Sequence, residues 1–312
     1  MTEPCDLTAV EARRLIGRKR LSPIELVESC IARTEMVNPT VNAVVAECYN
    51  RARDEARTAT EALVTGDDLG PLHGLPFGVK DLNDTEGLVT TFGSTLYRDN
   101  VPEKDELLVA KLRRAGGIVL GKTATPEFGA GGNTTVNSVH GYTRNPFDPS
   151  RACGGSSGGS GVALACGMMP LCTGSDSGGS LRKPATFNGV TAIRPTTGLV
   201  PSDKRSVGFT NFSVQGPMAR TAEDCALMLS VLAGDDIEDP LSFNVRRDDY
   251  RALPEIDLST VRVAVSVDFG WAPVENGIRE TFEARLAKFQ SVFKACDRFD
   301  PPLDSALDVF WI

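Results

Sequence analysis

Residues 172–182 read Cys-Thr-Gly-Ser-Asp-Ser-Gly-Gly-Ser-Leu-Arg, an unusually dense run of small and polar residues. We expect a strand to end at Thr173, a glycine-rich turn to follow, and a helix to begin near Ser180. The backbone N–H groups of Ser177, Gly178, Gly179 and Ser180 would point into one concavity at the helix N-terminus. The stretch therefore predicts an anion hole that contains a serine. The anion bound there can then be the oxygen of a tetrahedral intermediate. On this segment alone, an ordinary turn between strand and helix is an equally good interpretation.

Two other segments favour the functional interpretation. Residues 151–161, Arg-Ala-Cys-Gly-Gly-Ser-Ser-Gly-Gly-Ser-Gly, form another polar, glycine-rich turn before a predicted helix. Residues 74–81, Gly-Leu-Pro-Phe-Gly-Val-Lys-Asp, place Lys80 where an apolar strand ends. A lysine in that position is ordinarily solvated, but beside two serine loops it becomes a candidate base.

Short apolar runs alternate with helical stretches along the chain. This alternation predicts an α/β fold with a mixed, largely parallel central sheet flanked by helices. The expected strands are 41–46, 75–79, 117–120, 169–173, 190–193 and 261–267, and the expected helices are 7–16, 22–38, 49–63, 104–115, 157–167, 221–233 and 275–296. We expect residues 1–70 to be a helical segment packed on a core made by residues 71–312.

Composition excludes several classes of function. The 312 residues are 41% hydrophobic and 24% charged, with a formal net charge of -8, which is an ordinary balance for a soluble globular protein. Nucleic acid and membrane surfaces are therefore not expected as partners, and a cytoplasmic location is the default. The eight cysteines include no Cys-x-x-Cys pair, so neither a metal site nor a disulfide framework is predicted.

Three short motifs offer other interpretations. Residues 116–123 match the P-loop formula, but a predicted helix precedes them and their interior is itself a strand, so we reject a phosphate loop. Residues 154–158 match a nucleophile elbow, which needs a later histidine, whereas His73 and His140 both precede it. Ser180 and Lys183 match Ser-x-x-Lys, and Lys183 therefore stays open as a rival base.

The three segments together resemble the amidase signature family, which is marked by a Gly-Gly-Ser-Ser-Gly-Gly-Ser run. In that family the nucleophile lies 24 positions beyond the first serine of the run, and Ser156 and Ser180 have this separation. The strand ending in Gly-Val-Lys-Asp resembles the family segment that carries the base. The similarity extends from about Gly70 to Gly234.

The resemblance implies roles residue by residue. Ser180 corresponds to the acylated nucleophile, Lys80 to the base, and Ser156 to the relay serine, which the family holds in a cis peptide bond. The amides of residues 177–180 correspond to the oxyanion hole. Ser157 would lie near the lysine, and Asp176 and Arg182 would brace the loop. The substrate-binding loop corresponds to Ala130, Gly131 and Gly132. No metal or cofactor is implied.

The expected function is hydrolysis of a small organic amide through a serine acyl-enzyme. Two alternatives stay open: the glutaminase subunit of a tRNA-dependent amidotransferase, and a non-catalytic binding module that keeps the site. A homodimer is also open. The chain ends on apolar residues 308–312 and is shorter than is usual in the family, so we expect the fold to be incomplete at its C-terminus.

Overall fold

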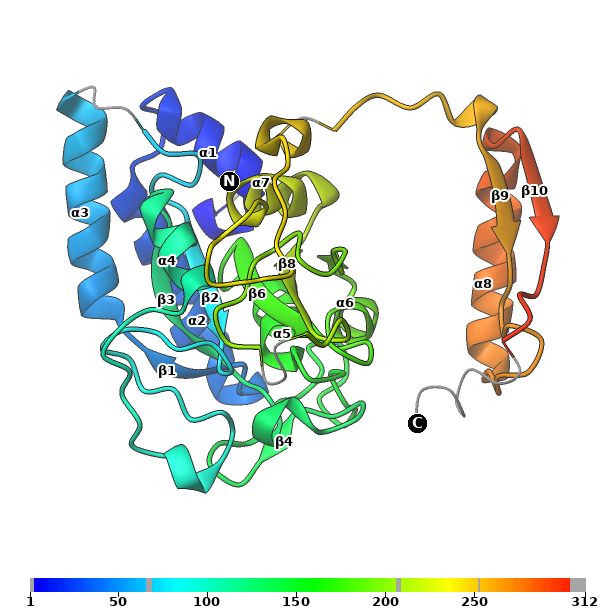
Figure 1. Ribbon diagram of the computed structural model, residues 1–312, viewed down its shortest axis with the longest axis horizontal. Coiled ribbons are helices and arrows are strands. Elements are labelled where there is room, and N and C mark those ends of the chain that lie inside the picture. The colour runs from blue at the N-terminus through cyan, green and yellow to red at the C-terminus, as the bar shows by residue number, and fades with distance from the viewer. Residues whose placement is uncertain (1–2, 66–68, 206–208, 252, 304–312) are drawn as a thin grey trace. The chain divides into compact units, whose positions relative to one another are not determined.

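The computed structural model describes residues 3–65, 69–205, 209–251 and 253–303. Two compact units are present, residues 1–253 and residues 254–312 (Figure 1). The division at 253/254 differs from the predicted one, which placed residues 71–312 in a single core. The helical first seventy residues lie in the first unit, where the backbone N–H of Val10 donates to Asp224 Oδ1 at 2.8 Å.

A six-stranded sheet is the centre of the first unit (Figure 1). Its order is β1-β3-β2-β6-β8-β7, with bounds Val44–Glu47, Ile118–Thr123, Pro76–Lys80, Leu171–Asp176, Val214–Ala219 and Thr191–Ala192. The three central strands β3, β2 and β6 run parallel, and the outer pairs are antiparallel. The mixed α/β fold is therefore confirmed. Strand β8 was not predicted, because Gln215, Gly216 and Pro217 interrupt its apolar pattern.

Seven helices accompany this sheet in the described residues of the first unit. They are α1 (Ala9–Gly17), α2 (Pro23–Val41), α3 (Tyr49–Thr65), α4 (Leu107–Arg114), α5 (Gly158–Ala165), α6 (Arg182–Asn188) and α7 (Ala222–Leu232). Short 3-10 turns occur at Pro4–Asp6, Thr95–Tyr97, Glu127–Gly129 and Arg247–Tyr250, and a small hairpin pairs β4 (Val136–Asn137) with β5 (Gly141–Tyr142). No helix in the described ranges combines the length and the apolarity needed to cross a bilayer.

Local sequence explains where the second helix begins and why its end was misjudged. Ser22 and Glu25 form a reciprocal capping box at the start of α2, as their spacing predicts. The predicted end at Asn38 was wrong, since the helix continues through Pro39 to Val41. Asn42 then adopts a left-handed conformation with φ 53°, which asparagine tolerates better than most residues, and its N–H donates to Asn38 O.

Helix α5 is buried on every side, and its glycines permit this. A Cβ atom on Gly159 would lie 2.2 Å from the backbone nitrogen of Ala124, and one on Gly161 would lie 2.7 Å from Asn188 Nδ2. The helix therefore approaches the end of β3 and helix α6 more closely than larger residues would allow. This close packing fixes the N-terminal end of α5, which follows directly on Ser156 and Ser157.

The second unit contains a parallel strand pair with a helical crossover. Strands β9 (Arg262–Val265) and β10 (Ala295–Arg298) pair in parallel, and α8 (Asn276–Phe289) connects them. The predicted helix 275–296 was too long, because pairing with β9 draws the last residues of that segment into a strand. The 3-10 turns Leu258–Thr260 and Gln290–Val292 complete the unit. The apolar end of the chain, residues 308–312, lies outside the described residues.

Candidate active site

Lys80, the predicted base, ends strand β2 with its amine among three serine hydroxyls. Lys80 Nζ lies 2.8 Å from Ser156 Oγ, 2.9 Å from Ser157 Oγ and 2.9 Å from Ser175 Oγ. We call these three serines the hydroxyl cluster. Two of them precede helix α5 and the third lies on β6, so the site joins the central strands to the start of one helix.

Burial determines the electrostatics of this lysine. Its side chain has no solvent exposure, and burial lowers its pKa from 10.5 to about 7, although the charge of Asp176 acts in the opposite direction. A shift of this size means that the site destabilises the ammonium form by about 5 kcal/mol compared with the same amine in water. An amine with such a pKa can accept a proton near neutral pH, which an exposed lysine cannot do efficiently.

Ser156 is held by an unusual backbone segment. The Gly155–Ser156 peptide bond is cis, as the family resemblance implies. Gly154 has φ 79°, and a Cβ atom on Gly155 would lie 2.5 Å from Thr134 O. Both positions therefore favour glycine. Ser156 itself is only 4% exposed, so its hydroxyl lies at the buried end of the site.

The loop that carries Ser180 is organised by Asp176. Strand β6 continues to Asp176 and helix α6 begins at Arg182, so the strand is longer and the helix starts later than predicted. The Asp176 carboxylate accepts hydrogen bonds from the backbone amides of Gly179 at 2.8 Å and Leu181 at 3.1 Å, and from the Arg182 guanidinium at 3.0 Å. Burial raises the pKa of Asp176, but these donors outweigh it and lower the pKa to about 2.

This loop geometry changes one detail of the predicted anion hole. The Gly179 amide points to the Asp176 carboxylate and cannot at the same time serve an oxyanion. The amides of Ser177, Gly178 and Ser180 remain the candidate donors. The sequence could not reveal this division, because any amide of a glycine-rich turn can face either side.

The two serine loops are joined by a backbone hydrogen bond. The N–H of Ser157 donates to the carbonyl of Ser180 at 3.2 Å, which brings the start of α5 beside the loop before α6. The rival base Lys183 is directed elsewhere, because its Nζ donates to Gly132 O at 3.2 Å. Of the two lysines, Lys80 is the one that contacts the serine hydroxyls.

The predicted substrate-binding residues Ala130, Gly131 and Gly132 lie in a loop beside the same site. A Cβ atom on the neighbouring Gly129 would lie 3.3 Å from Ser156 Oγ. Gly129 and Gly132 have φ values of 75° and 64°, which glycine adopts readily. Ala130 and Gly132 are exposed, so the loop has one face toward Ser156 and the other toward solvent.

Sequence reasoning missed two parts of the site. Ser175 contacts the amine directly, although the sequence analysis assigned it no role. Thr173 Oγ1 accepts a hydrogen bond from the backbone N–H of Lys80 at 2.8 Å and lies 3.4 Å from Asn83 Oδ1. The alternation along β6 could have suggested this, since Thr173 and Ser175 are two residues apart on the same face.

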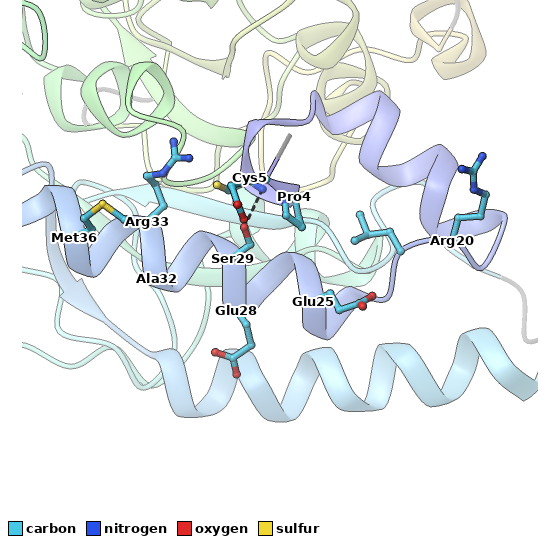
Figure 2. A pocket seen from close by; sticks show the side chains of 11 residues that line it. Pro4, Cys5, Arg20, Glu25, Glu28, Ser29, Ala32, Arg33 and Met36 are labelled. Carbon is cyan, nitrogen blue, oxygen red and sulfur yellow. Dashed lines mark hydrogen bonds between the residues drawn. The ribbon is translucent and has the colours of Figure 1, made fainter. Parts of the chain in front are cut away.

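A separate pocket lies between the N-terminal 3-10 turn and helix α2 (Figure 2). Several of its polar side chains are already paired: Ser29 accepts from the backbone N–H of Cys5, Glu25 caps α2, and Arg33 contacts Asp6. None of its lining residues belongs to the hydroxyl cluster. Among the described residues, no group of three or more His, Cys, Asp and Glu side chains could hold a metal ion.

Comparison with known proteins agrees with this architecture. A family model described as Amidase matches residues 25–309. The acylamidase of Rhodococcus erythropolis is 37% identical over 310 residues, which cover 98% of this chain and 65% of that protein. One component of the glutamyl-tRNA(Gln) amidotransferase of Roseiflexus castenholzii is 38% identical over 317 residues, which cover all of this chain and 64% of that protein.

A solved structure of a bacterial aryl acylamidase matches with a TM-score of 0.87 and 31% identity, over 96% of this chain and 62% of the other. This likeness places the fold among those of the amidase signature enzymes. The chain belongs to the amidase family. It spans just under two thirds of the length of the curated relatives it matches.

Proposed function

We propose that this chain hydrolyses an amide bond, with Ser180 as nucleophile, Ser156 as proton relay and Lys80 as base. The observation that carries the proposal is the Lys80 amine, which is fully buried and lies within hydrogen-bond distance of three serine hydroxyls. Burial without a directly bonded carboxylate favours the neutral amine, which is the form a base needs.

The proposed reaction has two stages. Lys80 takes the Ser180 proton through Ser156 while Ser180 Oγ attacks the amide carbonyl, and amides of residues 177–180 other than Gly179 stabilise the oxyanion. The relay then returns the proton to the leaving amine. Water, activated by the same relay, hydrolyses the acyl-enzyme and restores Ser180.

Covalent labelling tests the nucleophile. We expect a fluorophosphonate reagent to add one phosphonyl group to the chain, measured by intact mass, and the Ser180→Ala variant to remain unmodified. Ser150→Ala serves as the matched control, because Ser150 is an exposed serine bonded to Asp148. Labelling that persists in Ser180→Ala would refute the assignment.

A glutaminase component of an amidotransferase is the second candidate, and similarity to the glutamyl-tRNA(Gln) amidotransferase protein favours it. Both candidates use the same acyl-enzyme chemistry, so the substrate separates them. A panel of amides that includes glutamine, assayed for released ammonia or amine, decides between them. Activity on glutamine alone supports the glutaminase, activity on other amides supports the independent amidase, and silence on every amide supports a non-catalytic module.

A further inference from the structure

Three aromatic side chains gather beside the candidate active site. Tyr97 packs edge-to-face on Phe92, with ring centroids 5.0 Å apart, and on Phe128, with centroids 6.1 Å apart. We call Phe92, Tyr97 and Phe128 the aromatic cluster. Tyr97 is 41% exposed and Phe128 is 54% exposed, so the cluster presents ring surface to solvent and is not part of the core.

The backbone of the aromatic cluster is strained. Phe92 and Phe128 have φ values of 53° and 49°, in the left-handed region that large side chains rarely adopt. The two segments are tied together, because the Phe128 N–H donates to Phe92 O at 2.8 Å. Strain of this kind persists where the surrounding structure enforces it, and it is concentrated at functional sites. A purely structural turn would be more stable with glycine at these positions.

The aromatic cluster adjoins the reacting hydroxyl. Phe128 directly precedes Gly129, whose α-carbon faces Ser156 so closely that an added Cβ atom would lie 3.3 Å from Ser156 Oγ. The exposed ring of Phe128 is therefore one residue from the backbone that covers the proposed relay.

We propose that Phe92, Tyr97 and Phe128 form a subsite for an aromatic ring of the substrate, so that the chain prefers amides bearing an aryl group near the scissile bond. This inference rests on the proposed function. Aromatic pairs prefer edge-to-face or offset geometry, and the half-exposed Tyr97–Phe128 pair leaves ring faces and edges open for a third ring. The left-handed residues and the hydrogen bond between Phe128 and Phe92 hold these rings beside the loop that covers Ser156.

Two sulfonyl fluorides of different shape test the subsite. Phenylmethanesulfonyl fluoride carries a ring, and methanesulfonyl fluoride does not. In each case Ser180 Oγ forms a bond to sulfur, the sulfur–fluorine bond breaks, fluoride leaves, and the serine proton passes through Ser156 to Lys80. The quantity measured is the ratio of the two modification rates, determined by intact mass. When this ratio is compared between variants, the difference in intrinsic reactivity between the two reagents cancels.

We expect Phe128→Gly to lower this ratio by about 2- to 10-fold, the value of one aromatic contact. Glycine accepts the φ of 49°, so the variant removes the ring without forcing a new backbone conformation. Tyr97→Ala should lower the ratio similarly, and it changes a residue whose backbone is not left-handed. Phe147→Leu is the matched control: Phe147 is 75% exposed and lies outside the aromatic cluster, so its ratio should equal that of the parent chain.

The outcomes separate the two proposals. An unchanged ratio in both Phe128→Gly and Tyr97→Ala, or an equal fall in Phe147→Leu, would overturn the aromatic subsite while Ser180 labelling still supports the enzyme. If neither reagent modifies Ser180 and fluorophosphonate also fails, the proposed function falls and the subsite falls with it. Thermal melting of each variant confirms that the chain is folded.

Discussion

The surroundings of Lys80 and Lys122 form a natural comparison, because both lysines are completely buried on adjacent parallel strands. Lys122 pairs with Val79, and Lys80 pairs with Thr123, so the two lysines are offset by one residue and point to opposite faces of the sheet. Lys80 lies among hydroxyls. Lys122 contacts the carbonyl of Asn83 and the hydroxyls of Thr85 and Thr90, and its amine is 4.0 Å from Asp81 Oδ1.

This difference shows what converts a buried lysine into a base. Burial lowers the pKa of Lys122 to about 8, and the nearby charge of Asp81 opposes the change. The Thr85 and Thr90 hydroxyls donate their own protons to the carbonyls of Asn83 and Leu88. A carbonyl accepts hydrogen bonds but cannot pass on a proton, so the contacts of Lys122 hold its amine in place. The Ser156 hydroxyl beside Lys80 both accepts and donates, and can therefore carry a proton. Equal burial thus has two results, and the chemistry of the neighbouring atoms decides between them.

The largest expected effect is on the rate of Ser180 labelling, and it separates Lys80 from the rival base Lys183. Lys80→Met should lower the rate of Ser180 phosphonylation by about 100- to 10,000-fold, because a general base is lost. Lys183→Met, which removes the rival amine, should lower it by less than about threefold. The measurement is the initial labelling rate by intact mass, on variants whose folding is checked by circular dichroism. Collapse in Lys183→Met with near-normal labelling in Lys80→Met would reverse the assignment of the base.

The second effect concerns stability. Lys122→Met should lower the free energy of unfolding by about 3 kcal/mol, because the buried Asp81 carboxylate loses its cation and the Asn83 carbonyl loses a donor. Denaturant titration measures this. Lys204, whose side chain is 46% exposed, gives the control. Its replacement by methionine should lower the free energy of unfolding by less than about 1 kcal/mol. A Lys122→Met protein as stable as the parent would show that the two lysines do not differ in this way.

The smallest effect refines the Lys80 side of the comparison. Labelling should rise with pH and level off above about 7, because the pKa of Lys80 lies there and its amine is neutral at higher pH. Ser175→Ala removes one hydroxyl that accepts a hydrogen bond from the ammonium form, so the midpoint should move to lower pH. The change corresponds to about 1 kcal/mol, less than one pH unit. Ser175→Thr keeps the hydroxyl and should retain the midpoint; a midpoint that rises in Ser175→Ala would contradict this account.

Much of the fold was accessible from the sequence because its elements have strong local signals. The capping box at Ser22 and Glu25 and the apolar run ending at Lys80 both predict elements that the structure contains. Local signals failed where a distant partner decides the outcome. Strand β10 forms because it pairs with β9, and β8 forms beside β6 despite its proline, and neither pairing can be read from a short window.

The candidate site was predictable in its residue types but not in its contacts. The resemblance to the amidase signature family, carried by the glycine-rich loops, the 24-residue spacing and the strand before Lys80, indicated Lys80, Ser156 and Ser180. The direction of each group is visible only in the structure. The Gly179 amide donates a hydrogen bond to Asp176, and Ser175 contacts the lysine. Glycine-rich turns leave such choices open, since their backbone has many allowed conformations. The roles of these residues in catalysis stay predictions, which the labelling rates can test.

The hydrogen bonds around the Lys80 amine also bear on how the chain folds. They join residues 76, 77 and 95 positions apart in sequence. Bringing together segments so far apart costs chain entropy that no local turn repays, and contacts of this separation slow folding. The hydroxyl cluster can surround the amine only after β2, β6 and the start of α5 have docked. Serine reactivity in this protein should therefore appear late in refolding, after most of the helical signal, and would serve as a reporter of the completed first unit.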